Sequence, residues 1–150
     1  MIVLDTDVVV ELMRPTPDAR VLDWVDARPG TDLYITAVTA AELMMAAGRL
    51  QPVPNHDALR AAVGALLDEE FADRVLTFDT VAAHHYGAVV AGRAGRGRIA
   101  MADAQTAAIC RSTRAYLATR NAAAFTGTGV LVIDPWAAGE RWLPELPPVL

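Results

Sequence analysis

The chain alternates between short apolar runs and longer segments in which apolar residues recur at helical spacing. Five apolar runs, rich in β-branched or aromatic residues, are predicted as strands: residues 2–4, 33–36, 75–78, 115–119 and 130–133. Six intervening segments are predicted as helices: residues 7–14, 17–29, 39–50, 55–71, 80–91 and 99–111. Strands that alternate with helices in this way are typical of a parallel α/β sheet.

The first predicted strand, Ile2–Leu4, is followed immediately by the carboxylate of Asp5. In an open parallel sheet, ligands bind in the crevice beyond the carboxyl ends of the strands. Asp5 is therefore expected at the functional edge of the sheet. The alternative is that Asp5 or Asp7 only caps the helix that follows, because Asp is a favoured N-cap residue.

Two further acids occupy comparable positions near the starts of helices. Glu42 is expected in the first turn of the helix after the second strand, and Thr39-x-x-Glu42 also has the form of a capping box. Asp103 lies in a helix that is otherwise mostly small and apolar. Because burying an unpaired charge is costly, Asp103 needs either a metal ion or an arginine such as Arg96 or Arg98 beside it.

The side chains of Asp5, Glu42 and Asp103 come from three separate segments and together offer only hard oxygen ligands. Such ligands suit Mg²⁺ or Mn²⁺. A zinc site is not indicated, because His84 and His85 are adjacent and would point in different directions from a helix. The sequence therefore predicts a magnesium or manganese site.

Composition limits the remaining possibilities. A chain of 150 residues is expected to form one domain. The net charge of −5 argues against broad attraction to nucleic acid, although a local basic patch remains open. All 13 basic residues are arginines. With no membrane-length apolar run, no signal-peptide pattern and a single cysteine, Cys110, expected to be a buried thiol, we predict a cytoplasmic protein with no membrane association.

Several motifs in order along the chain carry a resemblance to one family. They are Ile2-Val3-Leu4-Asp5-Thr6-Asp7-Val8-Val9, Thr39-x-x-Glu42-Leu43, Ala102-Asp103-Ala104-x-x-Ala107-Ala108, Leu117-Ala118-Thr119-Arg120-Asn121-x-x-x-Phe125 and Gly129-Val130-x-Val132-Ile133-Asp134-Pro135-Trp136. In these pieces the chain resembles the PIN-domain ribonucleases, especially the VapC-type toxins of toxin–antitoxin pairs and their FitB-like relatives.

The resemblance implies a three-layer α/β/α domain with a central, mostly parallel five-stranded sheet. We expect a single domain over residues 1–150, with a core over about 1–134 and a proline-rich tail over 135–150 that carries Trp136 and Trp142. The activity implied is that of a metal-dependent endoribonuclease with Mg²⁺ or Mn²⁺ as cofactor. A cognate antitoxin and a homodimer are the partners implied.

The resemblance also assigns roles to individual residues. Asp5, Glu42 and Asp103 fall on the acidic positions of the family. The fourth acidic position corresponds to Asn121, a departure from the pattern that makes a metal-ligand role there tentative. Asp7 stands where many relatives carry Asn.

An RNA substrate would need basic side chains along the path of its backbone. The candidates for this role are Arg93, Arg96, Arg98 and Arg120. For each of them the alternative is an ordinary solvated arginine.

Three other functions compete with the nuclease. A haloacid-dehalogenase-type phosphatase would use Asp5 as nucleophile and Asp7 as acid/base, and a phosphoacceptor receiver domain would use a similar acid cluster. Both families normally need a lysine, which this chain lacks. The third alternative is a non-catalytic PIN-like interaction module, which the neutral Asn121 keeps open.

Overall fold

The central feature of the fold is a parallel sheet. The computed structural model describes residues 1–49 and 56–137. Within these residues the sheet has five strands: β1 (Ile2–Leu4), β2 (Leu33–Thr36), β3 (Val75–Leu76), β4 (Tyr116–Ala118) and β5 (Val132–Ile133). Their order is β3-β2-β1-β4-β5, and all four pairings are parallel, which confirms the predicted architecture.

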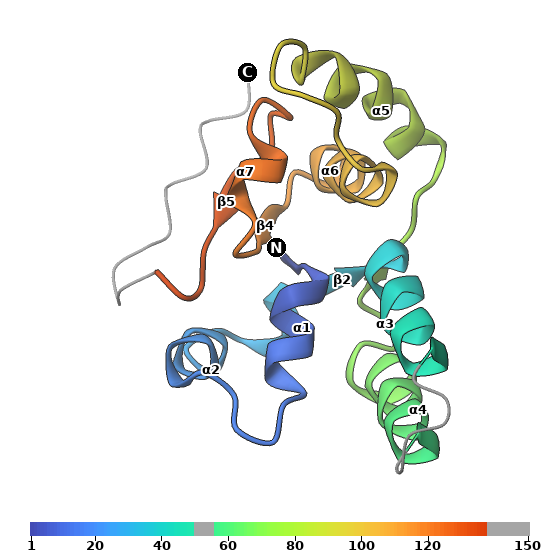
Figure 1. Cartoon of the computed structure of the whole chain (residues 1–150), viewed down its shortest axis with the longest axis vertical. Coiled ribbons are helices and arrows are strands. Elements are labelled where there is room, and N and C mark those ends of the chain that lie inside the picture. Colours follow the sequence, from blue (N-terminus) through green and yellow to red (C-terminus); the bar gives the residue numbers. More distant parts are fainter. Residues whose placement is uncertain (50–55, 138–150) are drawn as a thin grey trace.

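Helices cover both faces of the sheet. The described α-helices are α1 (Thr6–Leu12), α2 (Ala19–Asp26), α3 (Ala37–Arg49), α4 (His56–Ala65), α5 (Thr80–Gly92), α6 (Met101–Thr113) and α7 (Ala122–Phe125). In Figure 1, α5, α6 and α7 lie on one side of the strands and α1 to α4 on the other. The result is three layers, α/β/α.

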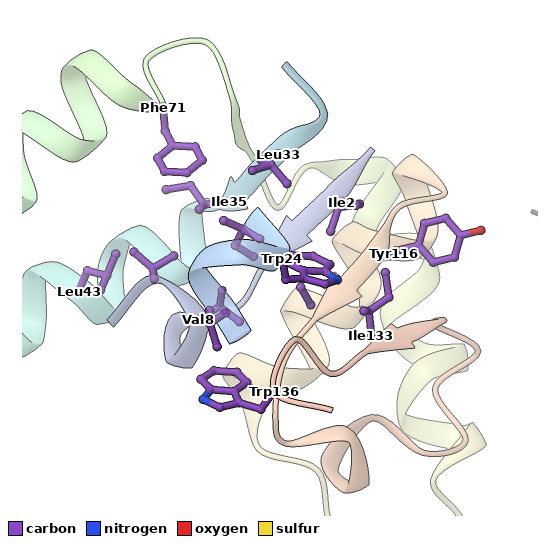
Figure 2. Packing of buried hydrophobic residues seen from close by; sticks show 14 of the residues in the cluster. Ile2, Val8, Trp24, Leu33, Ile35, Leu43, Phe71, Tyr116, Ile133 and Trp136 are labelled. Carbon is purple, nitrogen blue, oxygen red and sulfur yellow. The ribbon is translucent and has the colours of Figure 1, made fainter. Parts of the chain in front are cut away.

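The alternation of side chains along each strand divides the core in two. Ile2 and Leu4 of β1 pack with Trp24, Leu43 and other residues of the α1–α4 side (Figure 2), whereas Val3 packs with residues of α5, α6 and α7. All three strand residues are almost completely buried. Strands buried on both faces read as uninterrupted apolar runs, which is why β1 was visible in the sequence.

The direction in which strands are added to the sheet reverses between β1 and β4. From β1 the chain builds outward to β2 and β3, and it then returns to the other side of β1 for β4 and β5. The backbone N–H of Asp5 donates to the carbonyl of Ala118 at 3.0 Å, which ties the two strand ends together. Ligand sites in open α/β sheets form at such a reversal, so residues that follow β1 and β4 are placed for function.

Several predicted boundaries were wrong. The second helix ends at Asp26 instead of residue 29, because Pro29 disfavours helical backbone just before it. The predicted helix 55–71 is α4 followed by a π-helical turn, Leu66–Glu70, in which Phe71 N–H donates to the Leu66 carbonyl. β3 ends at Leu76 instead of residue 78. The four-residue helix α7 was not predicted.

The end of the described chain belongs to the core. Trp136 is only 8% exposed and packs in the α1–α4 cluster (Figure 2). The rest of the predicted tail, including Trp142, lies outside the described residues. Cys110 is buried, as expected. Across the described ranges, no helix has the length and apolar character needed to cross a membrane.

Candidate active site

Asp5 lies where β1 passes into α1, beside the end of β4. It is the N-cap of α1, and its Oδ1 accepts the Thr6 N–H at 2.9 Å. Burial, together with the negative charges of Asp7 and Asp103, raises the pKa of Asp5 to about 6, against the opposing effect of the hydrogen bonds from Thr6 and Thr119. The capping interpretation is thus correct, but capping alone leaves a carboxylate that is destabilised when ionised.

Glu42 approaches the same edge from α3. This helix follows β2, which lies on the opposite side of β1 from β4. The hydroxyl of Thr6 donates to Glu42 Oε2, so the residue after Asp5 holds the Glu42 carboxylate. The predicted capping box was wrong. α3 begins at Ala37, and the hydroxyl of Thr36 accepts the Thr39 N–H at 3.0 Å, so Thr36 caps the helix and Glu42 lies in the second turn. Glu42 is therefore not needed for capping.

Asp103 approaches from the opposite layer. It lies in the first turn of α6, whose N-cap residue, Ala100, offers no side chain to the free backbone N–H groups. The pKa of Asp103 is raised by burial and by the charge of Glu42, and it is lowered by Arg93. Arg93, which lies at the end of α5, takes the compensating role that the sequence suggested for Arg96 or Arg98.

Asp7 and Thr119 join α1 to the end of β4. Asp7 Oδ2 accepts the Arg120 N–H at 2.9 Å and the Thr119 hydroxyl at 3.2 Å. The Thr119 hydroxyl in turn accepts the Asn121 N–H at 3.1 Å. Sequence reasoning assigned Asp7 only to a capping or phosphatase role and did not identify Thr119. The Asp-x-Asp spacing was the signal that a second carboxylate lies beside Asp5.

The acids form a connected set. Asp5 is electrostatically coupled to Asp7 and Asp103, and Asp103 is coupled to Glu42. No three acidic, histidine or cysteine side chains of residues 1–49 and 56–137 already converge as a metal cage. The donor chemistry nevertheless fits a hard divalent cation, because every ligand is a carboxylate and Asp7 Oδ1 is buried without a hydrogen-bond partner among the described residues. Mg²⁺ also keeps several waters, which relaxes the demand for an all-protein cage.

The four candidate RNA-binding arginines lie in three different environments. Arg93 donates to the carbonyls of Ala123 and Thr126 at 3.0 Å, and to that of Arg96 at 3.2 Å, so it fastens the segment after α5 to α7. Arg120 lies over the ring of Trp136, with Cζ 4.6 Å from the ring centroid. Arg96 and Arg98 are exposed. Contacts with RNA remain predictions for all four.

The clamp around Arg93 depends on two glycines. A Cβ placed on Gly92 would lie 2.2 Å from the carbonyl oxygen of Gly127, and one on Gly127 would lie 2.5 Å from that of Gly92. Gly127 also has a φ of 83°. No larger residue fits this backbone contact, so the pair fixes the loop after α5 against the loop after α7.

Asn121 is exposed at the start of α7. It is the N-cap residue, but its side chain makes no capping hydrogen bond. Its position two residues after Thr119 places it at the same edge of the sheet as Asp5, beyond the carboxyl end of β4. A role as the fourth metal ligand stays a prediction.

The PIN domain matches residues 2–128, which is most of the chain. The chain belongs to the PIN-domain family. This membership does not support the phosphatase and receiver-domain alternatives, which would require other families. It also agrees with the fold and with the acidic edge just described.

Relatives of this PIN domain extend over nearly the whole chain. Toxin FitB of Neisseria gonorrhoeae is 34% identical over 137 residues, which cover 91% of this chain and 99% of FitB. The VapC ribonuclease Y4jK of Sinorhizobium fredii is also 34% identical over 137 residues, covering 91% of this chain and 98% of that protein. Among solved structures, FitAB bound to an IR36 DNA fragment superposes with a TM-score of 0.86 and 31% identity, over 95% of this chain and 100% of the other.

Proposed function

We propose that this PIN domain is a metal-dependent endoribonuclease and the toxin of a toxin–antitoxin pair. The observation that carries the proposal is that Asp103 of α6 acts electrostatically on Asp5 after β1 and is acted on by Glu42 of α3, so acids from three elements and both helical layers influence one another near the ends of β1 and β4. The names of the similar proteins, Toxin FitB and VapC ribonuclease, support the same activity. We propose that it acts in the cytoplasm, where its RNA substrate would be.

Asp5, Glu42 and Asp103 are the groups that would hold Mg²⁺ or Mn²⁺. When bound there, a divalent cation supplies an activated water and neutralises charge on the scissile phosphate. The protein's part is positioning: the Thr6 N–H orients Asp5, and the Thr6 hydroxyl orients Glu42. Asp103 is held by the first turn of α6, and Arg93 limits the repulsion between Asp103 and Glu42.

RNA would reach the acids along basic side chains on the same edge. Arg96 and Arg98 are exposed on the segment that Arg93 fastens, and Arg120 is exposed two residues after β4. Because the chain carries a net charge of −5, these arginines would provide local rather than overall attraction to the phosphates.

The partners proposed are a cognate antitoxin and a second copy of this chain. A nuclease of this kind must be held inactive in the cell, and an acidic pocket is a natural target for an arginine of an inhibitor. Expression of this chain alone should slow growth, and co-expression with the product of an adjacent small open reading frame should relieve the effect. A harmless gene with no such neighbour would remove the support for the toxin role.

The activity is tested by incubating the purified protein with a mixed RNA pool and, separately, with single-stranded DNA of the same composition. RNA cleavage that requires Mn²⁺ or Mg²⁺, is abolished by EDTA and is restored by added metal is the expected result. A non-catalytic interaction module would leave both pools intact at every metal concentration. Asp103→Asn serves as the control for a contaminating nuclease.

A further inference from the structure

The two carboxylate oxygens of Asp7 are in unequal surroundings. Oδ2 accepts two hydrogen bonds, from the Arg120 N–H and the Thr119 hydroxyl. Oδ1 is buried and has no hydrogen-bond partner in the described part of the chain. Leaving a buried polar atom unpaired is costly, and more so for a charged group. The structure thus holds Asp7 firmly by one oxygen and leaves the other without a partner.

Asp7 is also a close neighbour of Asp5. The negative charge of Asp7 acts on the Asp5 carboxyl, and the Thr119 hydroxyl that donates to Asp7 also lies near enough to Asp5 to stabilise its ionised form. The Thr119 hydroxyl, which donates to Asp7, therefore lies beside both carboxylates. This arrangement places Asp7 within the acidic set.

No arginine neutralises Asp7 in the described residues. The ion pairs found there join other residues, namely Arg14 to Glu11, Arg20 to Asp18 and Arg74 to Glu70. Arg120 is adjacent through its backbone, but its guanidinium lies over the Trp136 ring. A buried carboxylate oxygen without a cationic side chain is suited to a metal ion or a metal-bound water.

We propose that Asp7 supplies the fourth negative charge of the metal site, with Oδ1 binding the cation directly or through one water. This inference rests on the proposed metal site. Asp5, Glu42 and Asp103 contribute a formal charge of −3, and Asp7 makes it −4, so two divalent cations would be neutralised without an acid at residue 121. Oδ2 positions the carboxylate by fastening it to Thr119 and Arg120.

The surroundings of Asn121 make it the weaker choice for the fourth group. It is exposed, and its amide side chain is neutral and makes no capping bond to α7. Asp7 carries a charge, lies in the first turn of α1 and has the unpaired oxygen. The fourth charge of the site is thus provided from α1 instead of from the segment after β4.

The test is the affinity for Mn²⁺ alone, measured by isothermal titration calorimetry on the full chain. Asp7→Asn keeps an oxygen that accepts from Arg120 N–H and Thr119, so it removes the charge and preserves these hydrogen bonds. Asp134→Asn is the matched control: its Oδ1 also accepts a backbone N–H, from Trp136 at 2.9 Å, directly after β5 on the same sheet. Loss of ligand charge at Asp7 should weaken Mn²⁺ binding by about tenfold or more, whereas Asp134→Asn should bind as the wild type does.

The Mn²⁺ affinities of these variants distinguish a metal-binding role of Asp7 from a structural one. Unchanged affinity in Asp7→Asn, or a lowered melting temperature of the metal-free variant with unchanged affinity, would show that Asp7 is only structural. Adding Asn121→Asp to the Asp7→Asn variant supports the proposal if it restores binding. If Asn121→Asp tightens binding and Asp7→Asn has no effect, the fourth group belongs at residue 121. RNA cleavage by the wild type is scored separately, so a protein that binds Mn²⁺ through Asp7 without cutting RNA would refute only the proposed function.

Discussion

Replacing Asp5 by Asn should stabilise the metal-free protein while abolishing the metal binding that we propose for it. Burial raises the pKa of Asp5 from 3.8 to about 6 in the folded state, so the folded protein resists the ionisation that the unfolded chain undergoes freely. The stability contributed by protonated Asp5 is present below pH 3.8 and is lost as the pH rises through about 6. At pH 7.5 the ionised carboxylate therefore costs stability.

The size of the stability gain follows from the difference between the unfolded-state and folded-state pKa of Asp5. A difference from 3.8 to about 6 corresponds to about 3 kcal/mol, which is the upper limit of the gain. Asn caps helices about as well as Asp, so the hydrogen bond from the Thr6 N–H is retained. Weaker hydrogen bonds from Thr6 and Thr119 to a neutral amide reduce the gain by about 1 kcal/mol. For a chain of this size we expect the melting temperature to rise by roughly 4–8 °C.

The assay is thermal and urea unfolding in EDTA at pH 7.5 and at pH 4.5. Asp5→Asn should gain stability at pH 7.5, and most of the gain should disappear at pH 4.5, where folded Asp5 is protonated. Asp79→Asn is the matched control, because Asp79 is an exposed N-cap that accepts the Ala82 N–H at 2.9 Å in α5. A destabilised Asp5→Asn at pH 7.5, or an equal gain at both pH values, would refute the reasoning. Mg²⁺ should raise the melting temperature of the wild type and not that of Asp5→Asn.

Three further predictions concern stability and reactivity. Gly92→Ala should lower the free energy of unfolding in urea by about 1–3 kcal/mol, because its Cβ would meet the Gly127 carbonyl. Gly87→Ala in the same helix, with open space around it, should raise that free energy by up to about 1 kcal/mol, and equal effects of the two substitutions would contradict the clamp. Burial raises the pKa of the Cys110 thiol, so a thiol reagent at pH 8 should modify it only after unfolding. Trp136→Ala should lose about 3–5 kcal/mol by removing a buried ring, and a smaller loss would show that this end of the chain is dispensable.

The centre of the sheet was predictable from the sequence because β1 and β4 are buried on both faces. An unbroken apolar run such as Ile2–Leu4 is visible without any knowledge of its neighbours. Boundaries set by tertiary contacts were not visible. The π-helical turn before Phe71 brings that side chain into the core, and α7 is too short to show a period.

The sequence predicted the acidic residues of the candidate site, but it did not predict the residues that hold them by hydrogen bonds. A lone Asp103 in an alanine-rich helix and a carboxylate directly after β1 are local signals. The bond from the Thr6 hydroxyl to Glu42 joins residues 36 positions apart, and the bond from Thr119 to Asp7 spans 112 positions. Such pairings depend on strand order, so the sequence left a capping box open as the alternative role of Glu42, whereas Thr36 caps α3 in the structure.

The central claim is that Asp103, together with Asp5 and Glu42, forms a metal site that cuts RNA. The most direct measurement is the initial rate of Mn²⁺-dependent cleavage of a fluorescent RNA by Asp103→Asn beside the wild type, at equal concentration and with matching circular dichroism. We expect the rate to fall by about a hundredfold or more, because removal even of groups that only support a metal ligand costs up to about that much. A folded Asp103→Asn that keeps most of the wild-type rate at saturating Mn²⁺ would contradict the account.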